Sequence, residues 1–435
     1  MYAIFIVAIV ILSSIITKMT TKNWANPAVI MNTYWSIFII TSFFAFTGKY
    51  NWSYYGILWI VFACFFFTAG TLIGRGYKKK DKGKKINGSN GVVETELSSI
   101  SWTFVIASIV IGSFRFIFEV IKNGFSLGMF LNLNNLVSMN TTMAQQRYLG
   151  GGSSYGILMQ IMLAFVYVAP LLGGYAYIFA NNKRLKIITI MTFLPILGIV
   201  LFTNGKAGLI ASVFLWASGF IVANFKKYGR PPKIKIKKIL VLIIFMIGLF
   251  SLLYFSMLLR IGSFSASTRA TVNEKFITYA LGHMPAFDSW YSSFSSSEGF
   301  TFGSTTFIGF LNMLGLSSRS QGLYSEAIVI SNNIVTNVFT VNRGLISDYG
   351  RFGALVFYFI FGIFSGYFYN NVIIYKSNNN FSTVMLVATY FFILHSIFSS
   401  SWTYSSYILV FPLFYVYLLL ASSGRIRLLK RKRNK

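Results

Sequence analysis

Three charged residues stand directly before a long apolar run in the C-terminal part of the chain. Arg343, Asp348 and Arg351 fall within nine residues, and the apolar run that follows them continues to Tyr369. A guanidinium group binds phosphate oxygens through paired hydrogen bonds, and a carboxylate can take a proton from a hydroxyl group. Because the chain has only nine acidic residues, this cluster at a membrane boundary indicates a working surface for an anionic ligand.

Composition places the chain among the helical membrane proteins. Apolar residues make up 55% of its 435 residues, and mean hydropathy is +0.65. No water-soluble fold could bury so much apolar surface. The apolar runs are continuous and do not alternate with polar residues, which excludes the strands of a membrane β-barrel. The sequence therefore predicts an all-α polytopic membrane protein with one integral membrane domain over 1–435.

The apolar runs predict about eleven membrane-spanning helices. They are 2–17, 28–47, 54–74, 99–122, 155–180, 187–203, 207–225, 239–259, 351–372, 381–398 and 406–422. The first run lacks a basic start and is expected to be a retained span. With the N-terminus outside, 27 of the 38 lysines and arginines lie in connections that face the cytoplasm, as the positive-inside rule requires. The basic loop 75–98 and the basic tail 423–435 are then lipid-side anchors, and no nucleic-acid partner is expected.

This topology leaves two long outer segments, 123–154 and 260–350. The stretch 125–156 mixes apolar residues with amides at near-helical spacing, which predicts a helix on the membrane surface followed by a glycine hinge at 150–152. The second segment contains most of the acidic residues outside the cytoplasmic connections. We also expect interfacial helices in it, because the apolar stretch 307–316 is too short to span.

Basic residues accumulate in the outer connections, where the positive-inside rule predicts few. They include Lys206 in the hairpin 203–208, Arg147 beside the glycine hinge, and Arg260, Arg269 and Arg319 in the second outer segment. A ligand with several negative charges, such as a lipid-linked diphosphate, would account for this excess. The plain alternatives are arginines that only set the depth of a span end and, for Lys206, ordinary turn chemistry.

The stretch 279–294 brings four further candidates together: His283, Asp288, Trp290 and Tyr291. The two aromatic residues could stack on sugar rings, or they could belong to the aromatic belt of any such protein. No Ser-His-Asp pattern supports a hydrolase, and two histidines in the whole chain argue against a multi-histidine metal site.

Arg115 and Glu119 are four residues apart in the fourth predicted span, so they share one helix face. An ion pair inside the membrane is costly unless both charges are satisfied. The pair is therefore either functional or a structural link between helices.

The chain resembles the oligosaccharide repeat unit polymerases of bacterial surface polysaccharides, the O-antigen or capsule polymerases of the Wzy family. The resemblance covers the topology of the whole chain and the stretches 203–216, 279–290 and 337–369. In the last stretch the pattern consists of Thr340, Leu345, Asp348, Tyr349, Gly350 and Gly353. Lys206 stands at a hairpin position that is often held by arginine in this family. A lysine keeps the positive charge but cannot form the paired hydrogen bonds of a guanidinium.

The resemblance implies a GT-C-like polymerase or ligase architecture in the bacterial cytoplasmic (inner) membrane, with the active site on the periplasmic or extracellular side. Such a glycosyltransferase moves a growing glycan from undecaprenyl diphosphate onto a newly flipped lipid-linked repeat unit, building capsule or the O-antigen of lipopolysaccharide. No metal or other cofactor is expected. The implied partners are the lipid-linked oligosaccharide, membrane lipid, a chain-length regulator and a flippase.

Departure of a diphosphate creates negative charge, which fixed guanidinium groups would stabilise while a base takes the acceptor proton. The expected diphosphate contacts are Arg260, Arg269, Arg343 and Arg351, with Lys206, Arg147 and Arg319 as further contacts. The candidate bases are Asp348, then His283 or Asp288. Asp348 could instead hold Arg343 or Arg351 in place.

Two other functions remain open from sequence. A related ligase would move glycan onto a different acceptor, and sequence separates it poorly from a polymerase. A flippase for lipid-linked oligosaccharide should show two similar halves and charges along a path through the spans. In this chain the charges outside the cytoplasmic connections gather on one side, which favours the enzymes.

Overall fold

A computed structural model describes the chain except residues 1, 77–96, 150–155, 204–205, 230–235, 296–298, 318–323, 325, 332–333 and 434–435. Arg319, the glycine hinge, most of the basic loop 75–98 and the tip of the hairpin 203–208 therefore lie outside the described residues. The fold is 80% helical and groups into two compact units. Unit 1 comprises Met1–Val93 and Ile277–Ile408, and unit 2 comprises Glu94–Phe276 and Leu409–Lys435.

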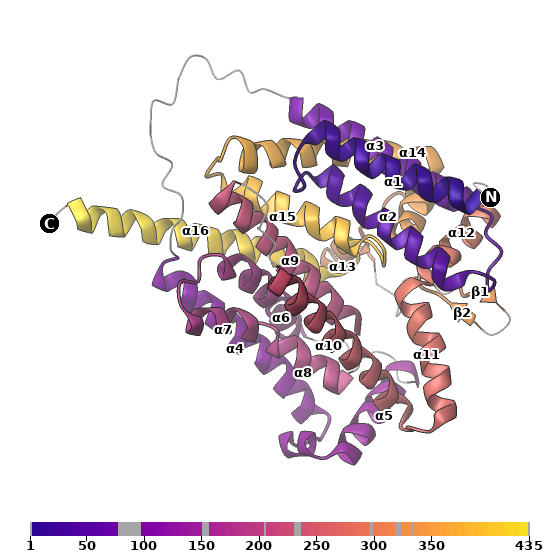
Figure 1. The fold of residues 1–435 in the computed structure, drawn as a ribbon. Coiled ribbons are helices and arrows are strands. Elements are labelled where there is room, and N and C mark those ends of the chain that lie inside the picture. Colours follow the sequence, from indigo (N-terminus) through magenta and orange to yellow (C-terminus); the bar gives the residue numbers. More distant parts are fainter. Residues whose placement is uncertain are drawn as a thin grey trace. The chain divides into compact units, whose positions relative to one another are not determined.

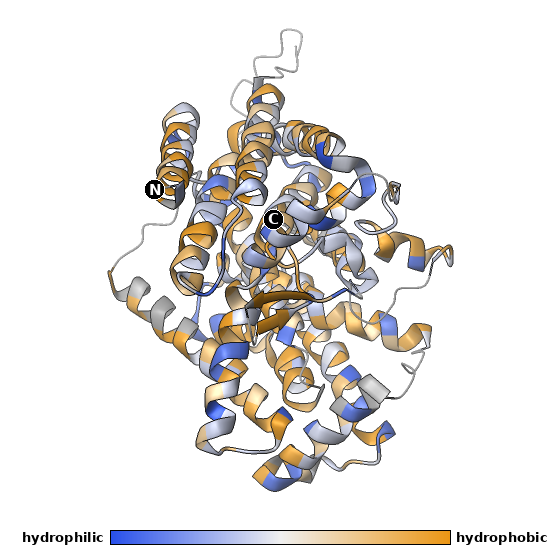
Figure 2. Ribbon diagram, turned by 90° about the vertical axis from the view of Figure 1, so that its right-hand side faces the viewer, coloured by the Kyte–Doolittle hydropathy of each residue, from blue (hydrophilic) through white to orange (hydrophobic). Residues whose placement is uncertain are grey.

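Within the described residues, nine helical segments are long and apolar enough to cross a membrane. This confirms an all-α polytopic membrane protein, and Figure 2 shows that hydrophobic residues dominate the long helices. Two shorter apolar helical stretches, Ile247–Ile261 within α10 (Ile236–Ile261) and Asn380–His395, stand where the eighth and tenth spans were predicted. Nine of the eleven predicted spans thus meet the criteria of length and hydropathy, and the total of eleven stays a prediction.

Unit 1 is organised around two helices that are far apart in sequence but side by side in Figure 1, α3 (Tyr55–Gly76) and α14 (Val341–Tyr369). Gly70 and Gly74 on α3 and Gly362 and Gly366 on α14 line their contact. At each of the four, a Cβ atom would run into a backbone carbonyl of the other helix. Glycines spaced four apart let helix backbones approach this closely.

The other helices of unit 1 pack around this pair or continue from it. They are α1 (Tyr2–Thr21), α2 (Pro27–Phe46), α12 (His283–Ser293), α13 (Ile308–Met313), η3 (Asn370–Ile374), α15 (Asn380–His395) and η4 (Ser401–Thr403). α16 (Ser405–Arg433) begins in unit 1 and continues in unit 2.

A small antiparallel hairpin, β1 (Ile328–Ser331) and β2 (Ile334–Thr336), precedes α14. Ile328 pairs with Thr336 and Val329 with Val335. Ile330 and Ile334 pack against the buried Phe46 at the end of α2. The sequence did not predict these strands, whose apolar face is completed by a residue from far along the chain.

α14 begins at Val341 and not at the predicted 351, so Arg343 and Asp348 lie inside the helix. Gly350 interrupts it with φ 73° and ψ 172°, a conformation that glycine adopts without a steric penalty. Arg351 follows the kink directly. The charged cluster is therefore positioned by two helical segments with a break between them.

Unit 2 contains the remaining helices. They are α4 (Ser99–Lys122), η1 (Leu127–Leu131), α5 (Leu133–Leu149), α6 (Ile157–Tyr177), α7 (Lys183–Met191), α8 (Leu194–Thr203), α9 (Lys206–Tyr228), α10 (Ile236–Ile261) and most of α11 (Ala266–Leu281). The surface helix predicted at 125–156 forms η1 and α5. The sixth predicted span consists of two helices, α7 and α8. α6 and α9 cross closely, because Gly174 and Gly219 each face a carbonyl of the other helix.

Candidate functional site

Arg343 is enclosed by aromatic rings in the first turns of α14. Only 6% of the residue is exposed. Its guanidinium carbon lies 4.0 Å from the ring centres of both Tyr324 and Phe339, and 5.3 Å from that of Trp290 on α12. The faces of aromatic rings attract a cation, and more strongly where water is excluded. The aromatic cage, formed by Trp290, Tyr324 and Phe339, therefore holds a permanent positive charge away from bulk water.

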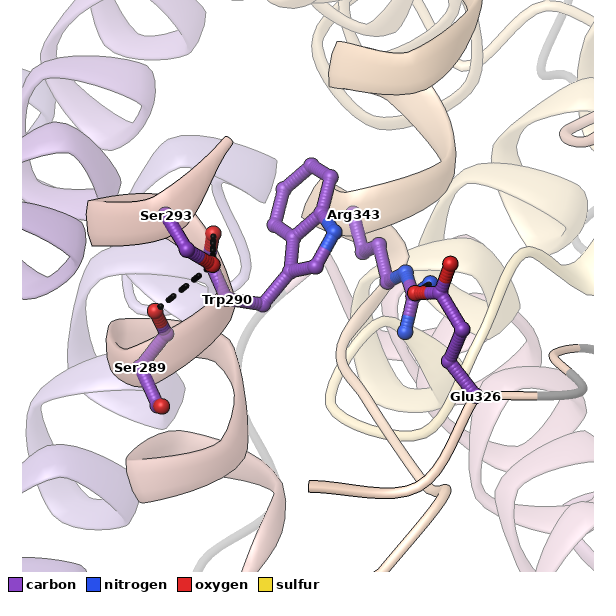
Figure 3. A network of polar contacts seen from close by, with 5 residues as sticks. All are labelled: Ser289, Trp290, Ser293, Glu326 and Arg343. Carbon is purple, nitrogen blue, oxygen red and sulfur yellow. Dashed lines mark hydrogen bonds and ion pairs between the residues drawn. The ribbon is translucent and has the colours of Figure 1, made fainter. Parts of the chain in front are cut away.

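Glu326 pairs with Arg343 from the solvent side. Its Oε2 lies 2.6 Å from Nη2 of Arg343, and the two side chains are 69% and 7% exposed, respectively. Figure 3 shows Glu326 beside the guanidinium and the indole of Trp290 extending from α12 toward Arg343. A buried charge whose counterion is exposed can be reached by an external anion that displaces this counterion. The pair therefore marks the accessible edge of the aromatic cage.

Arg343 is the charged group inside the aromatic cage, because the tyrosine of the cage stays neutral. Burial raises the pKa of the Tyr324 phenol, while the charge of Arg343 acts in the opposite direction. The phenol is thus neutral near pH 7, and the guanidinium does not deprotonate in proteins.

Arg351 lies just after the kink and is exposed. Its Nη2 donates hydrogen bonds to the backbone oxygens of Tyr291, at 3.1 Å, and Phe294, at 3.0 Å, and its guanidinium carbon lies 4.6 Å from the ring centre of Tyr291. A cation at a helix C-terminus satisfies carbonyls that lack helical partners. Arg351 thus fixes the end of α12 to α14.

Trp290 and Tyr291, the predicted glycan-stacking residues, each lie against one arginine of α14. Arg343 lies over Trp290, and Arg351 over Tyr291. Trp290 is only 7% exposed, so a sugar ring would have to displace its neighbours to stack on it. Glycan stacking by these two residues stays a prediction. The structure shows in addition that each of them packs against an arginine of α14.

Asp348 is fully buried and its oxygens are occupied. It accepts hydrogen bonds from the backbone N–H groups of Thr305, at 3.0 Å, and Thr306, at 2.7 Å, and from the hydroxyl of Thr301. These donors belong to the segment that precedes α13. Asp348 thus fastens this segment to α14, and its interactions with Arg343 or Arg351 stay a prediction.

We expect Asp348→Asn to destabilise the fold by about 1–3 kcal/mol, because an amide nitrogen cannot accept the hydrogen bonds that the carboxylate oxygens receive. The thermal unfolding midpoint of the purified variant in detergent measures this loss. Glu274→Gln is the matched control, because Glu274 is exposed and removing one exposed charge should change stability little. An Asp348→Asn protein with native stability and no activity would instead point to a catalytic role.

Asp288, another candidate base, caps the N-terminus of α3. Its carboxylate accepts hydrogen bonds from the backbone N–H of Ser53, at 2.8 Å, the Ser53 hydroxyl, at 2.9 Å, and the backbone N–H of Gly56, at 3.1 Å. Burial raises the pKa of the Asp288 carboxyl, and these hydrogen bonds act in the opposite direction. A carboxylate at a helix N-terminus meets both free N–H groups and the helix dipole. Asp288 therefore joins α12 to α3.

His283 is 1% exposed and packs edge-on against Phe398, with ring centres 4.8 Å apart. Its Nε2 lies 2.8 Å from the backbone oxygen of Tyr279, so this nitrogen carries the proton and donates it. Burial lowers the pKa of His283 to about 4. The imidazole is thus neutral near pH 7 and enclosed by apolar rings.

Stability should fall as the pH drops from 6.5 toward 4, because the unfolded chain then binds a proton that folded His283 excludes. At pH 5 the loss from this group is expected to be about 2 kcal/mol. The thermal midpoint of the native chain should decrease more between pH 7 and pH 5 than that of His283→Gln, which keeps an N–H donor but does not titrate. Equal decreases in both proteins would rule out this contribution.

Unit 2 contains the other predicted diphosphate contacts that the structure describes. Lys206 at the start of α9 and Arg260 at the end of α10 lie close enough for their positive charges to act on each other. Arg269 on α11 is exposed. Arg147 lies in α5, and the position of its side chain is outside the description. Lys206 and Arg260 thus converge within unit 2, as Arg343 and Arg351 do around α12 in unit 1.

Arg115 and Glu119 form the ion pair that their spacing predicts. The two side chains are each 5% exposed and lie 2.5 Å apart in α4. Because the two opposite charges pair with each other, burying them costs less free energy than burying either alone. The pair is nevertheless not strongly stabilising. The ion pair is therefore present in the fold, and its role, functional or structural, stays a prediction.

Sequence reasoning did not select Glu326, Tyr324 or Phe339 as site residues. Glu326 stands out only because acidic residues are few, and its distance from Arg343 in the chain follows no helical spacing. The hairpin of β1 and β2 leads the chain back to α14, which brings these residues around the guanidinium.

The described residues contain no group of three or more His, Cys, Asp or Glu side chains that could hold a metal ion. No family model, curated protein or solved structure matches this chain. The structure itself shows a multi-pass helical membrane protein. In its unit 1, aromatic rings enclose the guanidinium of Arg343 beside the exposed carboxylate of Glu326.

Proposed function

We propose that this protein polymerises undecaprenyl-diphosphate-linked oligosaccharide repeat units into a surface polysaccharide, by glycosyl transfer at the outer face of the bacterial cytoplasmic membrane. The observation that carries the proposal is the enclosed Arg343. The Arg343 residue is 6% exposed and its guanidinium lies within the aromatic cage, while its Glu326 partner is open to solvent. A fixed cation with an exchangeable counterion is suited to bind an incoming anion.

The reaction requires stabilisation of a leaving diphosphate. The acceptor hydroxyl oxygen bonds to the anomeric carbon of the donor glycan, the bond from this carbon to the diphosphate oxygen breaks, and the hydroxyl proton passes to a base. Negative charge grows on the departing undecaprenyl diphosphate. A guanidinium held in place before the reaction stabilises this charge more effectively than mobile water does.

Glu326 is exposed and therefore suits the role of the base. The three bases expected from sequence, Asp348, Asp288 and His283, are at most 1% exposed. In our proposal a diphosphate oxygen displaces the Glu326 carboxylate from Arg343. The freed carboxylate then stands beside the reacting sugars, where it can accept the proton of the acceptor hydroxyl. Binding of the donor would thereby prepare the proton acceptor.

Purified protein in lipid vesicles, supplied only with undecaprenyl-diphosphate-linked repeat units, tests the proposal. We expect a ladder of glycans on a gel and one free undecaprenyl diphosphate for each bond formed. A ligase would give no ladder without a second kind of acceptor. A flippase would move the substrate across the bilayer without forming a glycosidic bond, and either result would overturn the proposal.

A further inference from the structure

Unit 2 contains an apolar cavity of about 670 Å³ that no step of the proposed reaction uses. It is lined from four helices, α7, α8, α9 and α10, and from the end of α6. Its walls include Ile190 and Leu194 on one side, Val213 on α9, and Leu249 and Leu252 on α10. A cavity without polar partners for water stays dry and can bind a hydrocarbon. Its position between candidate spans makes lipid the available source.

The part of the cavity wall that α10 forms contains a glycine, which has no side chain to fill the cavity. Gly248 lines the cavity, and a Cβ atom added to it would meet no atom within 4 Å. Glycine in the interior of a helix costs about 1 kcal/mol relative to alanine. At this position it leaves open space in the cavity where another side chain would project.

One rim of the cavity is basic. Lys186 is the charged residue among the lining side chains, and its Nζ lies 6.0 Å from the ring centre of Tyr177, which also lines the cavity. Lys183 and Arg184 are exposed on the same helix, α7. Nearby, Lys227 donates a hydrogen bond of 2.9 Å to the backbone oxygen of Ile178. An apolar cavity with a basic rim matches an acyl chain that carries an anionic headgroup.

We infer that the cavity binds an anionic phospholipid of the cytoplasmic leaflet, with an acyl chain between α7, α8, α9 and α10 and the phosphate beside Lys186. The commitment to this leaflet follows from the charge pattern. The basic segments at 181–186 and 226–238 are predicted to face the cytoplasm, where anionic lipids give the membrane surface a negative potential. The site is separate from the proposed reaction and does not depend on it.

Native mass spectrometry of the full-length protein, delipidated in detergent, tests the site. The probes are phosphatidylglycerol and phosphatidylcholine with the same acyl chains, and undecaprenyl phosphate. We expect a phosphatidylglycerol complex with the native chain that Gly248→Phe weakens at least tenfold, because the ring occupies the cavity. Gly248→Ala is the matched control at the same position and should bind as the native chain does.

The headgroup contact has its own test. Lys186→Gln should weaken phosphatidylglycerol binding about fivefold, since one basic residue near a membrane surface contributes about that factor. Lys49→Gln, which removes an exposed lysine of unit 1, should leave binding unchanged. Equal binding by all variants, equal binding of phosphatidylcholine, or preferential binding of undecaprenyl phosphate would each overturn the inference. None of these outcomes depends on glycosyl transfer, so the proposed function is tested separately.

Discussion

Replacing Arg343 with alanine is expected to leave single repeat units where the native chain builds long glycans. Polymerisation should slow roughly 10²- to 10³-fold, the loss seen when one fixed group that stabilises developing charge is removed. The reason is the environment of Arg343, a residue that is 6% exposed and whose guanidinium is held between Tyr324 and Phe339. The glycan ladder formed by the purified variant measures the effect.

Arg343→Lys should lose nearly as much activity as Arg343→Ala. A lysine has no planar group to lie between the two rings, cannot form paired hydrogen bonds with phosphate, and loses its charge more readily when buried. A variant that retained full activity with lysine would show that a point charge is sufficient. That result would contradict our argument that the aromatic cage requires a planar guanidinium.

A loss of folding must be separated from a loss of chemistry. Arg184→Ala is the control for removal of an exposed arginine, and it should form the native ladder. For Arg343→Ala itself, added ethylguanidinium should partly restore the ladder if the cavity left by the side chain is intact. Normal long chains from Arg343→Ala, in protein shown to be folded, would contradict the site assignment.

Gly362→Leu on α14 is expected to prevent stable folding of unit 1. Even a Cβ atom at this position would enter the backbone oxygen of Phe67 on α3, and at Gly70 it would enter that of Phe359 on α14. Overpacking a buried contact costs about 1–3 kcal/mol and more where backbone must move. Since α3 and α14 form the central contact of unit 1, separating them should also displace Arg343. Size-exclusion profile and thermal midpoint in detergent measure this effect.

Gly76→Leu provides the matched control for this substitution. Gly76 ends the same helix, α3, and a Cβ atom added there meets nothing within 4 Å. Its variant should stay monodisperse with a thermal midpoint close to that of the native chain. If Gly362→Leu behaved like Gly76→Leu, the close contact between α3 and α14 would not be needed for the fold.

The candidate site shows the limits of assigning chemistry from residue type alone. Asp288 and Asp348 are carboxylates in a segment predicted to lie outside the membrane, and so were natural candidates for a base. In the fold one caps α3 and the other holds the segment before α13, each through backbone N–H groups. A buried carboxylate needs such donors, and the sequence carries no pattern that identifies them, because they come from segments distant in the chain.

Nine of the predicted spans could be determined from the sequence itself, because the bilayer acts on each apolar run separately and its demands depend on composition and length. The spacing of Arg115 and Glu119 likewise placed them on one face of α4. Only the tertiary structure decided that α14 begins before Arg343, that Glu326 covers this arginine, and that an apolar cavity lies between α7 and α10. These features depend on contacts between distant segments, whose packing and hydrogen bonds no local pattern specifies.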